Sequence, residues 1–491
     1  MAGPGYAPPM DDRRALLTRT AELANDFLDR LPNRPVGRPT DLEKLRAGLG
    51  GPLPDQPQDA GVVVEALAQG VEPGLIGSAG PRFFGFVVGG GVPAALAADW
   101  LASAWDQNAG LYVLSPAAAV AEEVAAHWLI ELFGLPEGSS VGFTTGATMA
   151  TFTGLAAGRH RVLERAGWNV EDDGYVGAPP IAVVLGEEAH VTVFASLQML
   201  GLGRARVHKV AVDGQGRMRA DALRETLGRL EGPVIVSAQA GNVNTGAFDP
   251  LDEVVPLVRA LPNSWLHVDG AFGLWAAAVH DLRDRVAGVE DADSWTTDAH
   301  KWLNVPYDSG IVICRDVAAH HAAMTLGASY YVETAGGERD PYNWVAESSR
   351  RARGFPVYAA LRSLGRGGLA DMIGGCCAIA RRMADGLRGA EGVTILNDVV
   401  LNQVLVRFAP AGASEAAGSS PDAAADDFTR RVIAAVQADG TCWLGGTTWH
   451  GMAAMRISVS NWSTTEADAD VSVEAILRCA LETAVATLAP V

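Results

Sequence analysis

The sequence predicts an α/β protein with a mostly parallel central sheet sandwiched by helices. Short apolar runs recur along the middle of the chain, and helical patterns such as 220–230 and 252–261 separate most of them. Unbroken apolar runs are typical of strands covered on both faces, and their alternation with helices is typical of a parallel sheet. The predicted strands are 181–185, 206–212, 234–238, 265–269 and 310–314.

Changes in this pattern divide the chain into three regions. Residues 1–95 are predicted as an N-terminal helical segment, because the run LLTRTAELANDFLDRL has helical spacing. Residues 96–365 carry the alternating pattern and form the predicted large domain. Within it Ser115-Pro116 opens a helix, with Ser as the cap and Pro in the first turn. Residues 366–491 are predicted as a small α+β domain that contains the strand runs QVLVRF and MRISVS.

Composition bounds the class of protein. The 491 residues are enough for two or three domains, and 48% hydrophobic against 19% charged residues is a globular balance. The formal charge of -19 argues against nucleic acid or an anionic membrane as the main partner. Five cysteines without a CxxC pair and an N-terminus without a signal-peptide pattern favour reduced thiols in a cytoplasmic protein.

Two charged residues stand out because of their apolar surroundings. Lys301, in DSWTTDAHKWLNVPYDSG, lies between a short strand-like run and the next strand, although most lysines are simply solvated. Asp269 ends the apolar run WLHVD, where an unpaired carboxylate is costly to bury. Its ordinary interpretation is a capping carboxylate, and its functional one is a partner for a cofactor's ring nitrogen.

Three further segments supply polar groups near the predicted strand ends. VGFTTGATMAT (141–151) is a Gly/Thr loop that feeds a helix, which suits an anion but is also an ordinary loop–helix junction. His190 follows the strand 181–185, and the amide-rich loop 238–250 follows another. In a parallel sheet ligands bind beyond the carboxyl ends of the strands, so one edge can gather all five features.

These motifs together resemble the group II pyridoxal-phosphate-dependent decarboxylases, which include aromatic-amino-acid, glutamate and histidine decarboxylases. The resemblance runs from about Pro81 to Leu364, and its most specific pieces are DAHKWLNVPYDSG, HVDGAFG, FTTGATMAT and SRRARGFPVYAALRSLGR. It implies fold type I, pyridoxal 5'-phosphate as the cofactor and decarboxylation of an amino acid. It also implies a homodimer with its active sites at the interface, where residues 1–95 pack on the partner subunit.

Carried over position by position, the resemblance assigns roles around the cofactor. Lys301 forms the Schiff base, Asp269 pairs with the pyridine nitrogen, His190 stacks on one ring face and Ala271 packs on the other. Ala147 and Thr148 hold the phosphate, and His300 lies beside the phosphate and the reacting centre. A polar contact comes from Asn242, Asn244 or Thr245, among which the sequence does not choose.

The sequence departs from the family pattern in three places. Met149 and Ala147 stand where many relatives carry Glu and Gly. Asp298-Ala299 stands where aromatic-acid members have Asn-Pro, which weakens the assignment to that branch but not to the family.

The family's lid tyrosine, which returns a proton to Cα, corresponds best to Tyr342, with Tyr330 and Tyr331 as competitors.

The side chain of the substrate is predicted to be hydrophobic or aromatic. The run 83–88 is apolar and holds no cation that could pair with a substrate's side-chain carboxylate. The residues placed by the resemblance near the side-chain pocket are Phe84, Phe86, Val87, Gln107, Asn108 and Tyr112.

Other functions remain as alternatives. An aldehyde-forming relative keeps the same cofactor site, and an aminotransferase would use Arg456 for the substrate carboxylate, although a structural strand arginine is the favoured interpretation. A cofactor-free binding protein is disfavoured by the intact Lys301, Asp269 and His190. No metal site is expected, since HExxH is absent, and the absence of GxSxG disfavours a serine hydrolase.

Overall fold

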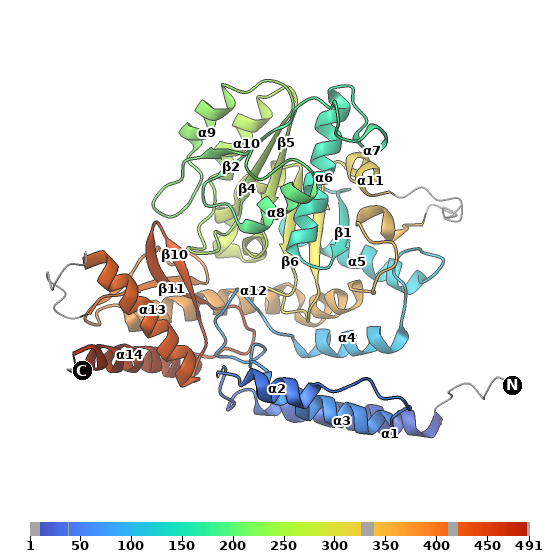
Figure 1. The fold of residues 1–491 in the computed structure, drawn as a ribbon. Coiled ribbons are helices and arrows are strands. Elements are labelled where there is room, and N and C mark those ends of the chain that lie inside the picture. The colour runs from blue at the N-terminus through green and yellow to red at the C-terminus, as the bar shows by residue number, and fades with distance from the viewer. Residues whose placement is uncertain (1–9, 38, 326–337, 411–420, 489–491) are drawn as a thin grey trace.

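The computed structural model describes residues 10–37, 39–325, 338–410 and 421–488, and its centre is a seven-stranded sheet (Figure 1). The order of the strands is β1-β7-β6-β5-β4-β2-β3. Their bounds are Ser140–Thr144 (β1), Ala182–Gly186 (β2), His208–Val210 (β3), Val234–Gln239 (β4), Ser264–Asp269 (β5), Ser294–Asp298 (β6) and Gly310–Cys314 (β7).

Five neighbouring strands of this sheet are parallel. β3, β2, β4, β5 and β6 pair in one direction, whereas β7 runs antiparallel to both β6 and β1. β1 therefore points the same way as β6, and the carboxyl ends of β1, β2, β4, β5 and β6 lie on one edge. The predicted class, a mostly parallel sheet between helices, is confirmed.

Alternate strand residues face two different layers of helices. On β2, Val183 and Leu185 join a cluster with helices α6 (Ala147–Arg165), α8 (Val191–Met199) and α11 (Val317–Met324). Val184 between them joins the main core, which also receives buried side chains from helices on the other face. These are α5 (Pro116–Phe133), α9 (Ala220–Leu227), α10 (Leu251–Arg259) and α12 (Gly354–Leu387). Because both faces are covered, the strands need apolar residues at every position.

The C-terminal residues form a second, antiparallel sheet with the order β10-β11-β9-β8. Its strands are β8 (Val393–Ile395), β9 (Gln403–Phe408), β10 (Gly445–Trp449) and β11 (Met452–Ser458), and its helices are α13 (Pro421–Asp439) and α14 (Glu466–Leu488). α12 leads into it from the large domain. This long helix bends at Gly365, whose φ of 61° is left-handed, next to the division that the sequence pattern suggests at 365/366.

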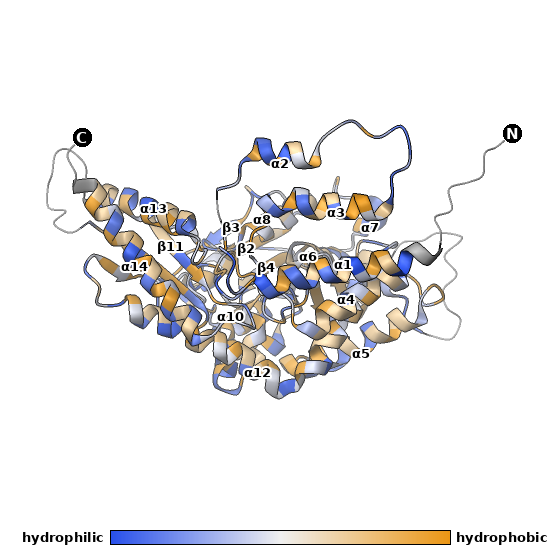
Figure 2. Cartoon of the chain, turned by 90° about the horizontal axis from the view of Figure 1, so that it is seen from below, coloured by the Kyte–Doolittle hydropathy of each residue, from blue (hydrophilic) through white to orange (hydrophobic). Residues whose placement is uncertain are grey.

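The N-terminal helices lie beneath the rest of the chain as a separate layer. They are α1 (Met10–Arg30), α2 (Leu42–Leu49) and α3 (Ala60–Val71), below α4 (Pro93–Trp105) in Figure 1. Seen from below, these helices show hydrophobic residues among the hydrophilic ones on their outer surface (Figure 2). Leu17, Val62 and Leu67 are 58%, 62% and 55% exposed. Within the described residues, no helix is both long and apolar enough to cross a bilayer.

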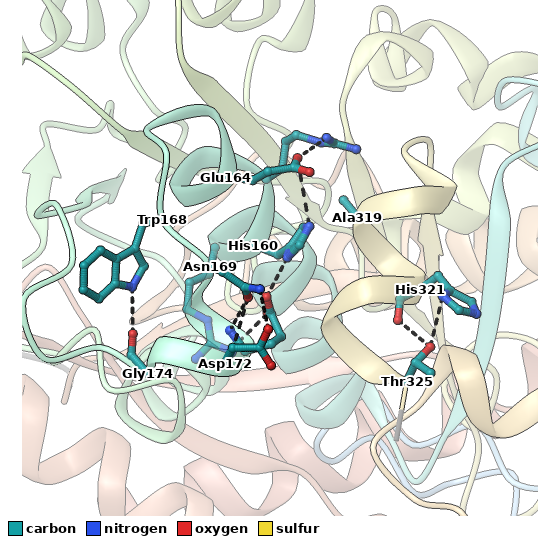
Figure 3. Close-up of polar contacts among 12 residues, drawn as sticks. His160, Glu164, Trp168, Asn169, Asp172, Gly174, Ala319, His321 and Thr325 are labelled. Carbon is teal, nitrogen blue, oxygen red and sulfur yellow. Dashed lines mark hydrogen bonds and ion pairs between the residues drawn. The ribbon is translucent and has the colours of Figure 1, made fainter. Parts of the chain in front are cut away.

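Polar contacts fix the far end of α6, as Figure 3 shows. His160 Nδ1 lies 2.7 Å from a carboxylate oxygen of Glu171 in the short helix α7 (Val170–Asp173). Arg161 makes two 2.6 Å hydrogen bonds to Asp316, which caps α11. Trp168 Nε1 donates to Gly174 O at 2.9 Å. These contacts hold the helix whose other end reaches the carboxyl edge of the sheet.

Two strands differ from the sequence prediction. β1 overlaps residues 141–144 of the stretch 141–151, which the sequence pattern presents as a Gly/Thr loop because Gly142 interrupts its short strand signal. Here Gly142 is needed, since a Cβ at this position would lie 2.3 Å from Trp344 O. The predicted strand 206–212 shortens to three paired residues in β3, which sits at the edge of the sheet and pairs only with β2.

A buried ion pair joins the loop before α12 to α5 and β1. Arg350 and Glu122, whose side chains are 0% and 1% exposed, lie 2.7 Å apart. Arg350 also donates to Ala109 O and Phe143 O at 2.8 Å each. Removing one member of such a pair leaves the other charge buried without compensation.

We expect Glu122→Gln to lower the free energy of unfolding by about 3–5 kcal/mol, because it leaves the Arg350 guanidinium unpaired. The matched control is Glu131→Gln on the same helix, which breaks an exposed ion pair with Arg366. Such a pair is worth less than about 1 kcal/mol. Urea unfolding followed by circular dichroism measures both, and equal losses for the two variants would contradict the assignment.

Candidate active site

Five segments that carry polar or charged side chains meet at the carboxyl edge of the sheet. They follow β1, β2, β4, β5 and β6, and carry Ala147, His190, Asn242, Asp269 and Lys301 respectively. Main-chain hydrogen bonds connect neighbouring segments. Ala240 N after β4 donates to Asp269 O at the end of β5 at 2.8 Å, and Asp298 N at the end of β6 donates to Ala271 O at 2.9 Å. The convergence expected from the sequence is therefore present.

Lys301 lies in a tight turn after β6. Its ammonium nitrogen is 5.6 Å from the centre of the Phe272 ring and makes no hydrogen bond within the described residues. Burial lowers the pKa of the Lys301 amine, while the carboxylates of Asp298 and Asp269 raise it. The sequence has only two other lysines, Lys44 and Lys209, and both are exposed. Lys301 is thus the one lysine held among buried charges.

Asp269 occupies the last position of β5, where its side chain is nearly enclosed. The residue is 6% exposed, and its carboxylate accepts a hydrogen bond from Ala271 N at 3.2 Å. Its charge acts on Lys301 and on His190, whose pKa it raises. Each carboxylate oxygen can accept two hydrogen bonds, so this carboxylate can still accept one from a protonated ring nitrogen.

His190 caps the first turn of α8. Its Nδ1 lies 2.7 Å from Thr192 Oγ1 and accepts from Thr192 N at 3.4 Å, so the ring proton belongs on Nε2. Burial is the main cause that lowers the pKa of His190, and Lys301 adds to it, while Asp269 opposes it. A neutral imidazole with a free Nε2–H results at neutral pH.

The N-terminus of α6 has no side-chain cap. Gly146 stands at the cap position, and Ala147 N donates instead to Asp298 Oδ2 at 3.2 Å. Ser196 of α8 holds the first turn by donating to Thr148 O at 3.2 Å. Gly310 lets β7 approach, because a Cβ there would lie 2.2 Å from the main chain of Gly146. Uncapped amides at the start of a long helix favour an anion.

His300 has one ring nitrogen bound and one buried without a partner. Its Nδ1 lies 2.8 Å from Val305 O, whereas Nε2 has no partner among the described residues. Burial lowers the pKa of His300 to about 4. Its ring stacks on Tyr307 with the ring centres 3.3 Å apart, and Tyr307 is 67% exposed.

The loop after β4 gives its three polar residues different tasks. Asn242 Oδ1 accepts from Asn244 N and Thr245 N at 2.9 and 3.2 Å, and Thr245 Oγ1 donates to Gln215 O at 2.7 Å. Asn244 Oδ1 accepts from Thr447 Oγ1 at 3.0 Å in the small domain. Asn244 therefore faces the small domain, while Asn242 and Thr245 stabilise the loop.

Arg456 of β11, for which a structural role is the favoured interpretation of the sequence, lies close to the site. Its guanidinium lies 3.5 Å from Asn244 Oδ1, and its charge lowers the pKa of both His190 and Lys301. Burial lowers the pKa of Arg456 itself. No carboxylate forms an ion pair with it within the described residues. Only the folded arrangement of the two domains brings this strand residue to the site.

The residues predicted for the substrate pocket lie in different environments. Phe84 and Val87 are fully buried in the main core, and Phe86 is 62% exposed. Gln107 and Asn108 bond nearby groups, with Gln107 Nε2 donating to Trp105 O at 2.9 Å. Tyr112 is partly buried and donates its main-chain N–H to Asp340 Oδ1 at 2.8 Å.

Of the three candidate lid tyrosines, Tyr330 and Tyr331 lie outside the described residues. Tyr342 sits in a 3-10 turn (Pro341–Trp344) and is 2% exposed, and its main-chain N–H donates to Gly110 O at 2.9 Å. Its placement is thus a packed turn and not an exposed loop tip.

These residues fit pyridoxal phosphate. The structure offers a lysine amine without a hydrogen bond, a strand-end carboxylate, an uncapped helix N-terminus and a buried His300 Nε2 without a partner. The amine matches the cofactor's aldehyde and the carboxylate matches its ring nitrogen, while the helix end and His300 Nε2 both match its phosphate. Within the described part of the chain, no cluster of His, Cys, Asp and Glu is arranged to hold a metal ion.

Comparison with known proteins agrees with this geometry. A family model described as the pyridoxal-dependent decarboxylase conserved domain matches residues 43–409. The chain is 26% identical to Tryptophan decarboxylase 1 of Oryza sativa subsp. japonica, over 92% of this chain and 90% of that protein. It is 32% identical to L-2,4-diaminobutyrate decarboxylase of Rhizobium meliloti (strain 1021), over 65% and 63%.

A solved structure shares the whole fold. The crystal structure of Oryza sativa TDC with PLP and tryptamine superposes with a TM-score of 0.89 at 24% identity, covering 97% of this chain and 99% of that one.

We expect borohydride reduction of the protein with pyridoxal phosphate to label Lys301 alone. Peptide mass spectrometry should find one phosphopyridoxyl group there, and Lys301→Ala should lose the label and the visible absorbance. Lys209→Ala is the control and should keep both, because Lys209 is exposed on β3. Label on Lys209 or Lys44 in the unaltered protein would refute the assignment.

Proposed function

The chain belongs to the pyridoxal-dependent decarboxylase family, and from this premise we propose that it converts an L-amino acid with a hydrophobic or aromatic side chain to the amine and carbon dioxide. Its class, a pyridoxal-phosphate-dependent carboxy-lyase, follows from the family. The observation that carries the proposal for the site is the convergence of Lys301, Asp269 and His190 on one sheet edge.

The cofactor supplies an electron sink for the bond that breaks at Cα, and the protein chooses that bond. Lys301 provides the amine for covalent attachment. Asp269 would hold a proton on the ring nitrogen, because an anion at this point favours the charged ring. Neutral His190 offers its Nε2–H and a flat apolar ring face. Ala147 and Thr148 would hold the phosphate through the main chain of the first turn of α6.

An apolar segment next to the lysine supports a hydrophobic substrate. Gly89 N donates to His300 O at 3.3 Å, so residues 83–88 run directly into the site. Phe86 packs on Trp443 with ring centres 5.5 Å apart, and Phe83 stacks on the other part of the same ring at 5.0 Å. Tryptophan decarboxylase 1 of Oryza sativa subsp. japonica, which matches over 92% of this chain and 90% of its own length, is named for tryptophan.

We also infer a homodimer with active sites at the interface. Several large apolar side chains of α4 and the loop after it are exposed, among them Trp100 (43%), Trp105 (49%) and Val113 (70%). The exposed ring of Tyr307 stacks on His300 and would be covered by a partner subunit, as would the exposed ring of Phe86. We infer the cytoplasm as its location, because all five cysteines are buried free thiols.

Arg456 favours a second candidate, an aminotransferase that binds the substrate carboxylate through a partly buried guanidinium. An aldehyde-forming decarboxylase is the third, since it would use the same Lys301 site with a different fate for the reaction at Cα. The three candidates differ in the products they release, which makes product analysis decisive.

We expect a panel of L-amino acids with added pyridoxal phosphate to yield amine and carbon dioxide from aromatic or large aliphatic members. Substrates with a side-chain carboxylate or a second amine should react at least about tenfold more slowly, because the apolar residues 83–88 offer no charged partner for the substrate's side chain. Mass spectrometry identifies the products. An aldehyde with oxygen consumed, or a keto acid without carbon dioxide, would replace the decarboxylase assignment.

We expect the protein in solution to have about twice the mass of the 51.3 kDa chain, because an obligate interface would cover the apolar surface of α1–α4. Light scattering after size-exclusion chromatography measures this mass. Trp105→Glu should shift it towards the monomer, while Val176→Glu, at an exposed residue outside that surface, should not. A monomeric, fully active enzyme would exclude a shared site.

A further inference from the structure

Asp298 is a second buried carboxylate in the site, and none of the roles above uses it. It ends β6 three residues before Lys301 and is 9% exposed. Its Oδ1 accepts from His300 N at 2.9 Å, and its Oδ2 accepts from Ala147 N at 3.2 Å. One side chain thus joins the lysine-bearing turn to the first turn of α6.

The charge of Asp298 acts electrostatically on the Lys301 amine. Among the carboxylates that raise the pKa of the Lys301 amine, Asp298 has the larger effect and Asp269 the smaller one, while Arg456 opposes both. Burial raises the pKa of Asp298, and Lys301 lowers it. The other titratable groups around the pair are Tyr307, whose pKa Asp298 raises, and the imidazoles of His190 and His300.

This carboxylate lies at the helix end that would bind the cofactor's phosphate. It already accepts the Ala147 N–H that starts α6, and the same helix end attracts a phosphate. Two anions at one helix end repel each other. A neutral amide of the same shape would lack that repulsion, but its single oxygen could accept only one of the two N–H groups.

We propose that Asp298 is a positioning residue that limits cofactor capture: it fastens the Lys301 turn to α6, and its negative charge favours the charged form of the Lys301 amine and opposes phosphate at the helix end. The inference rests on attachment at Lys301. Capture needs the neutral amine, whose nitrogen bonds to the aldehyde carbon while the carbonyl oxygen leaves as water.

Two probes separate the two effects of the charge. Pyridoxal, which lacks the phosphate, reports on the Lys301 amine, and inorganic phosphate as an inhibitor of its capture reports on the helix end. The full-length protein is freed of cofactor with hydroxylamine. Capture is then followed by visible absorbance from pH 5.5 to 9.5, with borohydride trapping to confirm Lys301 as the site.

Asp298→Asn should move the midpoint of the pH profile for pyridoxal capture down by about one unit, because the amine loses a neighbouring anion. Below both midpoints capture should be about tenfold faster. Inorganic phosphate should inhibit the variant at about fivefold lower concentration. Asp298→Glu, which retains the charge, should keep the profile of the unaltered protein.

Asp293→Asn is the matched control. Asp293 lies just before β6, at the opposite end of the strand, is 8% exposed and pairs with Arg259 at 2.9 Å. This variant should change neither the profile nor phosphate inhibition. If Asp298→Asn does not fold, Asp298→Ser removes the same charge and must show the same shift.

An unchanged pH profile and unchanged phosphate inhibition in folded Asp298→Asn or Asp298→Ser would overturn the proposal. That result differs from a failure of the proposed function. If the unaltered protein traps pyridoxal elsewhere than on Lys301, the attachment site is wrong. If it traps on Lys301 without a shift in the variants, only the role of Asp298 is wrong.

Discussion

The burial of one lysine amine among two carboxylates is the interaction on which the rest of the site depends. Lys301 is partly buried, and Asp298 and Asp269 offset part of the cost of taking its charge out of water. This arrangement requires the ends of β5 and β6 to be adjacent, which the parallel pairing of those strands provides. It also requires close approach of β7 at Gly310 and of the segment around Gly89, where a Cβ would meet Lys301 O at 1.9 Å.

The two domains share this centre. The large domain supplies the lysine, the carboxylates and the uncapped helix end, whereas the small domain supplies Arg456 and the hydroxyl of Thr447, both of which meet Asn244. α12 joins the domains as one helix bent at Gly365. The orientation of β11 relative to the large sheet therefore determines how strongly the Arg456 charge lowers the pKa of His190 and Lys301.

Much of the fold could be predicted because both faces of the sheet are covered. Continuous apolar runs located β2, β4, β5 and β7 to within about a residue at each end. β1 could not be found in the same way, since its Gly142 serves close packing against Trp344 O and its threonine is not apolar. The antiparallel direction of β7 also has no local signal, because direction depends on the connection and not on the composition of the strand.

The site was partly predictable for a related reason. Lys301 and Asp269 are charged residues inside apolar stretches of sequence. Burying a charge is costly, so a charge in such a stretch indicates a functional role. Arg456 alternates with apolar neighbours as any strand arginine does, and only tertiary structure shows its proximity to His190. Asp298 was visible as a departure from the aromatic-branch pattern, but its two main-chain partners come from different segments and needed the fold.

A crystal structure of the protein with pyridoxal phosphate tests the central claim most directly. We expect continuous density from Lys301 Nζ to the cofactor, the Asp269 carboxylate within hydrogen-bond distance of the ring nitrogen, and the phosphate against the first turn of α6. A cofactor attached elsewhere, or one whose ring nitrogen lies away from Asp269, would contradict it.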